Sequence, residues 1–303
     1  MAAIITSKFR LNNAEQFTES FSESAPTAYY LFIGRSSTWQ TDLDVQGNSI
    51  VEGTDSTPPT PNDDVVSEFY NYDEILGLKK IASSDVSQVI PKRTWTTGTT
   101  YDMYEHNISA ANTSASSATN LFDAAFYVIN SANNVYKVIE NDGATASTSE
   151  PTSTATSIFS TADGYRWKYM YSLSTTHDTN FVSTDFMPVS TNSTVAAAAV
   201  NGALDTILVA AGGSSYDVSG GGTTGNITAV PIRGDGSGGV ATVTITSGAI
   251  SGATITTAGT NYTFAYIRNA DIIAATNAGG NGSGGNLNVI IPPKGGHGKD
   301  SPK

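Results

Sequence analysis

The three histidines of this chain are the residues best suited to acid–base or metal chemistry. His106, His177 and His297 lie in separate segments without the close spacing of a zinc site, and the chain has no cysteine. No GxSxG segment accompanies them, so the nucleophile elbow of a serine hydrolase is missing. We therefore expect surface histidines, no metal site, no cofactor and no enzymatic activity.

Glycine-rich segments are a second pattern that could carry chemistry, because backbone N–H groups in such loops can cradle phosphates. The segments GDGSGG (234–239) and GNGSGG (280–285) are not followed by a helical pattern, as a phosphate-binding loop would be. They indicate turns rather than a nucleotide site.

Charge and composition restrict the possible partners. Lys and Arg number 15 and Asp and Glu number 27, which gives a net charge of −12. That charge repels phosphate backbones and argues against nucleic acid as the main partner. No stretch approaches the ~18 consecutive apolar residues that span a bilayer, so we expect no membrane insertion. The abundance of Ser, Thr, Asn and Gly favours a β-rich structural protein over a helical enzyme.

Residues 164–173, GYRWKYMYSL, are predicted to form a strand with two different faces. Aromatic residues occupy every second position, and Arg166 and Lys168 lie between them. We expect the aromatic face to belong to the core. The basic side is the more interesting one for contact with a neighbouring subunit.

Other cations also lie beside aromatic residues. Lys8 and Arg10 flank Phe9, and a second pair of cations precedes Trp95. Such pairs could bind an acidic partner face, and structural salt bridges would use the same residues. The candidate partner-interface residues are Lys8, Arg10, Arg35, Trp39, Lys92, Arg93, Trp95, Arg166 and Lys168.

Hydrophobic periodicity predicts a fold that is mainly β with a few short helices. Asn13 is expected to cap one helix, and Ser67 a second that continues to Lys80. Strands are expected over residues 28–34, 86–95, 126–129, 135–139 and 165–173, and residues 181–189 form one more short apolar segment.

An internal repeat begins after the composition changes near residue 191. A shift of 46 residues carries Tyr216 onto Tyr262 and the GSGG of one glycine-rich segment onto that of the other. Two such units favour a small sandwich or a brief solenoid-like stack. We expect a layered β-sandwich body with short helices at 1–195, a Gly-rich β module with two repeats at 196–291, and at 292–303 the start of a return segment whose C-terminal part is missing.

Five short segments can be considered together. They are residues 5–10 (ITSKFR), 32–36 (FIGRS) with Trp39, 58–61 (PPTP), 89–93 (VIPKR) with Trp95, and 163–169 (DGYRWKY). In this order they resemble the gene-eight baseplate wedge subunit of T-even-like contractile-tailed phages, over about residues 1–190. The Gly-rich repeat and the PPKGGHG segment at 292–298 look like the longer relatives found in cyanophage-type myoviruses.

The resemblance implies a structural subunit of the virion's tail baseplate, mainly β, which provides protein–protein interfaces for assembly and contraction. It implies a homodimer within each wedge, contacts with other wedge proteins, and no catalytic residues. The lack of cysteine agrees with assembly in the reducing host cytoplasm.

Two alternatives remain open. A glycan-binding or glycan-cleaving phage tail protein should expose an aromatic platform in a groove, whereas a wedge subunit should bury its aromatic strands. The repeat module could instead serve as a spacer that tolerates insertion.

Overall fold

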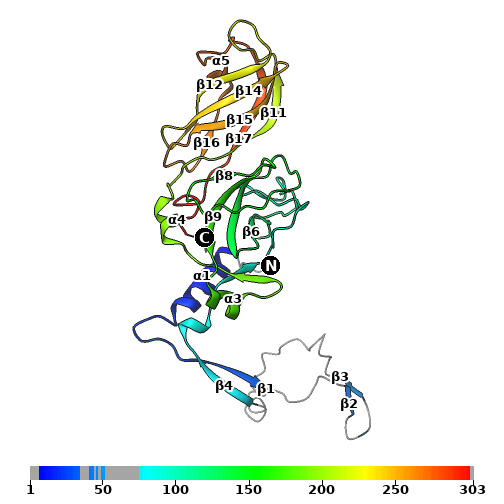
Figure 1. Ribbon diagram of the computed structural model, residues 1–303, viewed down its shortest axis with the longest axis vertical. Coiled ribbons are helices and arrows are strands. Elements are labelled where there is room, and N and C mark those ends of the chain that lie inside the picture. Colours follow the sequence, from blue (N-terminus) through cyan, green and yellow to red (C-terminus); the bar gives the residue numbers. More distant parts are fainter. Residues whose placement is uncertain (1–6, 35–40, 44–45, 47–48, 52–74, 301–303) are drawn as a thin grey trace. The chain divides into compact units, whose positions relative to one another are not determined.

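The computed structural model describes residues 7–34, 41–43, 46, 49–51 and 75–300 (Figure 1). Strands account for 35% and helices for 13% of the structure, which confirms the prediction of a mainly β protein with few helices. The described sheets are small, and none of them closes into a barrel. The chain divides into two compact units, residues 1–88 and 89–303, which we describe separately. The domain boundaries expected near residues 195 and 291 remain predictions.

The described part of the first unit consists of a helix and two antiparallel ribbons. Helix α1 spans Ser7–Glu19. Strand β1, Tyr29–Gly34, pairs with β4, Ile75–Ile81. The second ribbon joins two short strands, and a 3-10 turn follows β4: these elements are β2 (Thr41–Leu43), β3 (Ser49–Val51) and η2 (Ser83–Asp85).

Both helix predictions for this unit are wrong in part. Asn13 lies inside α1 instead of capping it. No Gly or Pro interrupts this helix, and an interior asparagine costs only about 0.7 kcal/mol. Residues 75–80 of the second predicted helix belong to strand β4, because pairing with β1 supplies their backbone hydrogen bonds. The rest of that prediction, residues 67–74, lies outside the described residues.

The second unit contains a four-stranded antiparallel sheet in the order β6-β7-β9-β8. The predicted hairpin and the predicted aromatic strand are confirmed as β6–β7 and β9. A separate ribbon pairs β5 with β10. The bounds are β5 Val89–Pro91, β6 Tyr127–Ile129, β7 Asn134–Glu140, β8 Phe159–Ser160, β9 Arg166–Ser172 and β10 Phe186–Pro188.

Two short helices in this unit were not predicted. Helix α3, Thr175–Phe181, is capped by Ser174, whose hydroxyl accepts a hydrogen bond from the His177 N–H. Helix α4, Ser193–Ala198, is capped by Asn192 in the same way. Both are too short to show a helical period, so only their caps identify them in the sequence.

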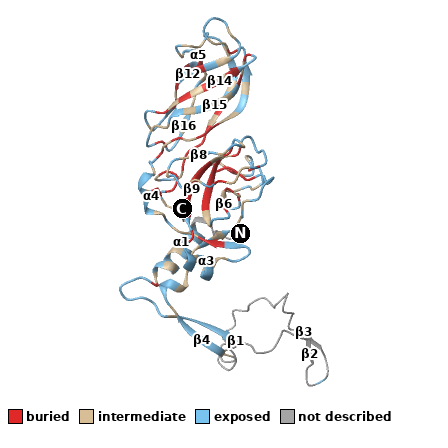
Figure 2. Ribbon diagram, viewed as in Figure 1, coloured by how far each residue is buried: buried red, intermediate tan, exposed pale blue. Residues whose placement is uncertain are grey.

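Strand β9 is buried on both faces (Figure 2). Tyr165, Trp167 and Tyr169 belong to one hydrophobic cluster, whereas Tyr171 belongs to another. The pairing of β9 with β7 shifts at Met170, and such a β-bulge changes which face the following residues occupy. The aromatic face is core, as expected, but the expectation that all four aromatic residues share one face is wrong.

The repeat module is built from short strands and one helix. Its strands form three sheets, β11-β17, β12-β14-β15 and β13-β16. The bounds are β11 Ile207–Ser214, β12 Gly225–Pro231, β13 Arg233–Gly234, β14 Val240–Thr246, β15 Ala249–Thr257, β16 Ala265–Tyr266, α5 Asn269–Ile273 and β17 Ser283–Val289.

The first strand of each repeat pairs with the last strand of the other. In β14–β15, Val243 lies opposite Ala253, and in β17–β11, Val289 lies opposite Ile207. The shift of 46 residues carries one of these pairs onto the other. The repeats are therefore interleaved rather than stacked one after the other, and each needs the other to pair its strands.

The tyrosine of each repeat packs on the GSGG turn of the other. The Tyr262 hydroxyl accepts a hydrogen bond from the Gly239 N–H at 3.1 Å, and the Tyr216 hydroxyl accepts one from the Gly285 N–H at 3.0 Å. Gly213 and Gly259 also correspond, with φ of +62° and +64°. A Cβ at Gly213 would lie 2.4 Å from the Gly285 nitrogen, so this close approach requires glycine.

After β17 the chain returns to the place where it entered the module. The Ile290 N–H donates to the Thr206 carbonyl at 3.0 Å, and the Gly295 N–H donates to the Asn201 side chain at 2.9 Å. The Ile291 N–H donates to Nδ1 of His106 at 3.1 Å. The entry and exit of the module therefore lie side by side on the body.

Candidate interaction surfaces and a buried charge cluster

The two cations of β9 are both engaged within the chain. Nη1 of Arg166 lies 2.9 Å from the Glu140 carboxylate and 2.8 Å from the Asp205 carbonyl oxygen. Lys168 is 5% exposed and donates to the Thr156 carbonyl. The contact that the sequence suggested for them with a neighbouring subunit remains a prediction.

Lys137, Lys168, Asp205 and His297 form a buried charge cluster where the module joins the body. Nε2 of His297 lies 3.8 Å from the Asp205 carboxylate, and the imidazole packs edge-on against Tyr104. Nζ of Lys137 lies 3.7 Å from the centre of the same Tyr104 ring. The expectation of a surface histidine is therefore wrong for His297, which the return segment places 7% exposed.

Burial dominates the protonation of this cluster. It lowers the pKa of Lys137 to about 7 and raises the pKa of Asp205 to about 6. It also holds the pKa of His297 well below its usual value, so this imidazole is neutral at pH 7. A cavity of about 200 Å³, lined in part by Lys168, Asp205 and His297, adjoins the cluster. The cluster thus couples the strands of the body electrostatically to the entry and the return of the module.

The remaining candidate cations and tryptophans are scattered over the chain. Nζ of Lys92 donates to the Ser183 carbonyl at 3.2 Å, and Nε1 of Trp95 donates to the Ser147 hydroxyl at 3.1 Å. Arg93 is half-buried beside them in sequence. Lys8 and Arg10 lie in α1, where Arg10 is exposed, while Arg35 and Trp39 lie outside the described residues. Of the candidates that the structure describes, Arg166 and Lys168 lie together around Asp205. The interface assignments remain predictions.

Asp163, which precedes the aromatic strand, is a structural carboxylate. It accepts hydrogen bonds from the backbone N–H groups of Thr148 and Ser149 and from the hydroxyls of Ser147 and Thr161. Burial alone would raise its pKa, but these hydrogen bonds outweigh burial and lower the pKa to about 2. Asp163 thereby fastens a polar loop to the start of the aromatic strand.

The ribbon of β1 and β4 is the most apolar exposed element in the described residues. Six of its large apolar side chains are 45% to 68% exposed and lie on both faces of the ribbon. No other described strand pairs with either edge. These side chains are Tyr30, Leu31, Phe32, Ile33, Leu76 and Leu78.

The described part of the chain contains neither a candidate metal site nor a candidate membrane-spanning helix. Among these residues no group of three or more His, Asp or Glu could hold a metal ion. None of the described helices is long and apolar enough to cross a membrane. The observations that remain are buried aromatic strands and one exposed apolar ribbon.

The described residues define a protein that is mainly β, with few helices. Residues 3–142 match the model of the Phage-Gp8 family, described as Bacteriophage T4, Gp8. These residues are therefore similar to the gene-eight baseplate wedge subunit, and the resemblance seen in the sequence is confirmed for this part of the chain. The family is a structural component of the phage tail baseplate. No curated protein matches the chain, and the likeness to cyanophage-type long relatives remains a prediction.

Proposed function

We propose that this chain is a non-enzymatic wedge subunit that forms a homodimer through its β1–β4 ribbon and contacts other wedge proteins. It would be assembled in the host cytoplasm, and its interfaces would transmit rearrangements during tail contraction. The family match over residues 3–142 supports the structural role, and the match includes the ribbon.

The exposed ribbon is the observation that carries the proposal. Two strands alone are marginally stable in water, and exposed apolar patches of this kind mark interaction sites. Lys79 and Lys80 are its only charged residues, and Lys79 is paired with Asp85 at 2.6 Å. A second copy can present the same apolar edge and faces in a two-fold arrangement, without unpaired charge at the centre.

The buried aromatic strand separates this proposal from a glycan-binding function. Tyr165 and Trp167 are 0% exposed and Tyr169 is 5% exposed. They pack against Tyr136 and Tyr101 instead of forming a platform. This is the arrangement expected of a wedge subunit.

The test is the oligomeric state of the full chain by sedimentation velocity. The double variant Ile33→Asp, Leu78→Asp places one carboxylate on each face of the ribbon and should convert a dimer into a monomer. Phe122→Asp is the control, because Phe122 is 55% exposed and lies in the second unit. A monomeric wild type, or a dimer that survives the double variant, would refute dimerisation through the ribbon. Co-purification with other wedge proteins then tests the proposed contact with those proteins, independently of dimerisation.

A further inference from the structure

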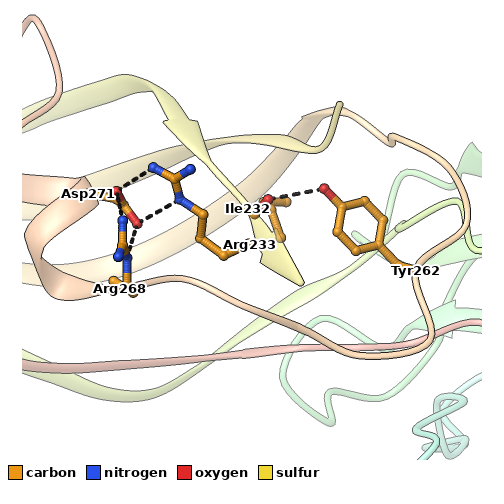
Figure 3. Close-up of polar contacts among 5 residues, drawn as sticks. All are labelled: Ile232, Arg233, Tyr262, Arg268 and Asp271. Atoms are coloured by element: carbon orange, nitrogen blue, oxygen red, sulfur yellow. Dashed lines mark hydrogen bonds and ion pairs between the residues drawn. The ribbon is translucent and has the colours of Figure 1, made fainter. Parts of the chain in front are cut away.

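Two arginines in the repeat module hold one carboxylate between them (Figure 3). Asp271 is 9% exposed, and both of its oxygens are occupied. Nε and Nη2 of Arg268 lie 2.8 and 2.9 Å from them, and Nε and Nη2 of Arg233 lie 3.2 and 2.9 Å away. The hydrogen bonds from Arg268 and then from Arg233 hold the pKa of Asp271 well below its usual range, so it stays ionised.

This pairing leaves a net positive charge with free donors. Two guanidinium groups face a single carboxylate, while the chain as a whole carries −12. The Arg233 and Arg268 side chains are 45% and 53% exposed. Among the described residues, the Nη1 groups of both have no hydrogen-bond partner. Asp271 thus fixes the two guanidinium groups in place while each retains N–H groups for another acceptor.

Two exposed aromatic rings lie next to these guanidinium groups. Phe264 is 53% and Tyr266 is 47% exposed, and their rings are nearly parallel, with 5° between the planes and 6.5 Å between the centres. Tyr266 lies directly opposite Arg233 in the β13–β16 ladder, so the two side chains share a face. Arginine and aromatic side chains together are the residue types that dominate protein interfaces.

Only one of the two repeats carries this group of residues. The shift of 46 residues preserves the tyrosines, the GSGG turns and the strand pairing described above. The other repeat has no charged or aromatic side chain at the positions that correspond to the two arginines, the two rings and the aspartate. Those positions hold Gly279, Gly222, Val218, Gly220 and Gly225. The shared scaffold therefore does not account for the group, which is an addition to one repeat.

We propose that Arg233, Arg268, Phe264 and Tyr266 form a docking patch for an acidic segment of a neighbouring protein. The free guanidinium donors would bind an Asp or Glu carboxylate, and the rings would cover an adjacent apolar side chain. Charge complementarity supports this partner, because the patch is positive on an acidic chain and nucleic acid is repelled by the rest of it. The inference goes beyond the proposed function, since it assigns an interface to the module and does not involve the ribbon.

The test is a binding titration of the full chain with two synthetic peptides and one polysaccharide. The first peptide alternates Glu and Leu, the second has Gln in place of every Glu, and polygalacturonate is the acidic polysaccharide. The patch should bind the Glu-Leu peptide and not the Gln-Leu peptide. Arg233→Gln, Arg268→Gln and the double variant Phe264→Ala, Tyr266→Ala should each weaken binding about tenfold.

Lys294→Gln is the control, because it removes one positive charge from an exposed side chain outside the patch. It should leave the affinity unchanged, and the melting temperature of every variant shows whether the module is intact. Absence of Glu-Leu binding, an equal loss in Lys294→Gln, or intact variants that bind normally would overturn the proposal. Tighter, patch-dependent binding of polygalacturonate would also overturn it, in favour of an acidic glycan.

Discussion

Lys137 is a single buried charge that makes the folding stability of the body depend on pH. It is 3% exposed, and no carboxylate lies within ion-pair distance among the described residues. Its contact with the Tyr104 ring replaces only part of the lost hydration. Because burial lowers its pKa from 10.5 to about 7, the unfolded chain binds this proton more tightly than the folded one. The charge therefore opposes folding fully below pH 7, and its cost disappears as the pH rises towards 10.5.

We expect Lys137→Met to stabilise the protein at pH 6 by about 1–3 kcal/mol, because an apolar side chain of similar length needs no hydration. The gain should shrink at pH 10, where the wild-type lysine is neutral in the folded state. Urea unfolding of both proteins at the two pH values measures the difference. Lys294→Met, at an exposed lysine, should change stability by less than about 0.5 kcal/mol at either pH. A destabilised Lys137→Met at pH 6 would show that the ammonium group contributes favourably.

The sequence could not show this cluster, because its members are brought together by contacts that have no local pattern. Lys137 reads as an ordinary polar position of a hairpin strand, and His297 as part of a glycine-rich tail. His297 is buried only because the return segment packs on Tyr104, which lies far away in the sequence. Arg166 was recognised as a cation on a two-faced strand, but its partner Asp205 belongs to the entry of the module.

At the scale of elements, local patterns predicted strands well and long-range pairing poorly. The β6–β7 hairpin and β9 follow from β-branched and aromatic alternation around turn residues. The assignment of residues 75–80 to a helix failed because its partner, β1, lies more than 40 residues earlier. In the module the period of 46 residues was visible, but a sequence shift does not reveal that the first strand of each repeat pairs with the last strand of the other.

The interleaved repeats predict matched effects of matched substitutions. Tyr216→Phe and Tyr262→Phe each remove a hydroxyl that accepts a hydrogen bond from a glycine of the other repeat, Gly285 or Gly239. Each hydroxyl also donates a hydrogen bond, from Tyr216 to the Asn269 side chain and from Tyr262 to the Ile232 carbonyl. Each change therefore removes one accepted and one donated hydrogen bond and should cost about 1–3 kcal/mol, with similar values for the two tyrosines. Thermal or urea unfolding of the full chain measures both. Ser214→Ala, which removes an exposed hydroxyl of the module, is the control and should be nearly neutral. Strongly unequal costs at the two sites would contradict the symmetry.

At the scale of the whole molecule, the module is joined to the body through two adjacent strand segments. In the β11–β17 ribbon Leu208 lies opposite Asn288, and the next pair along the ribbon is Val209 with Leu287. The contacts next to the body, such as the hydrogen bond between Thr206 and Ile290, lie on the body side of the Leu208–Asn288 pair. A short turn can therefore connect the two strands where the module begins, without disturbing the buried charge cluster.

We expect the body to fold when residues 209–287 are replaced by a short loop containing Asn-Gly, since this dipeptide suits a tight antiparallel turn. The excised chain should keep a cooperative thermal transition, because the clusters around Trp167 and Met170 involve few module residues. The same loop placed between residues 138 and 166 removes β8, the end of β7, and the buried Tyr165 with Asp163, so it should abolish folding and is the control. Loss of cooperative unfolding in the excised chain would show that module and body form one folding unit. If the excised chain folds, its ability to assemble with wedge proteins separates two roles of the module. Normal assembly would show that the module is a spacer. Failed assembly of an intact body would show that the module is a required interface, which is the outcome that the arginine and aromatic patch predicts.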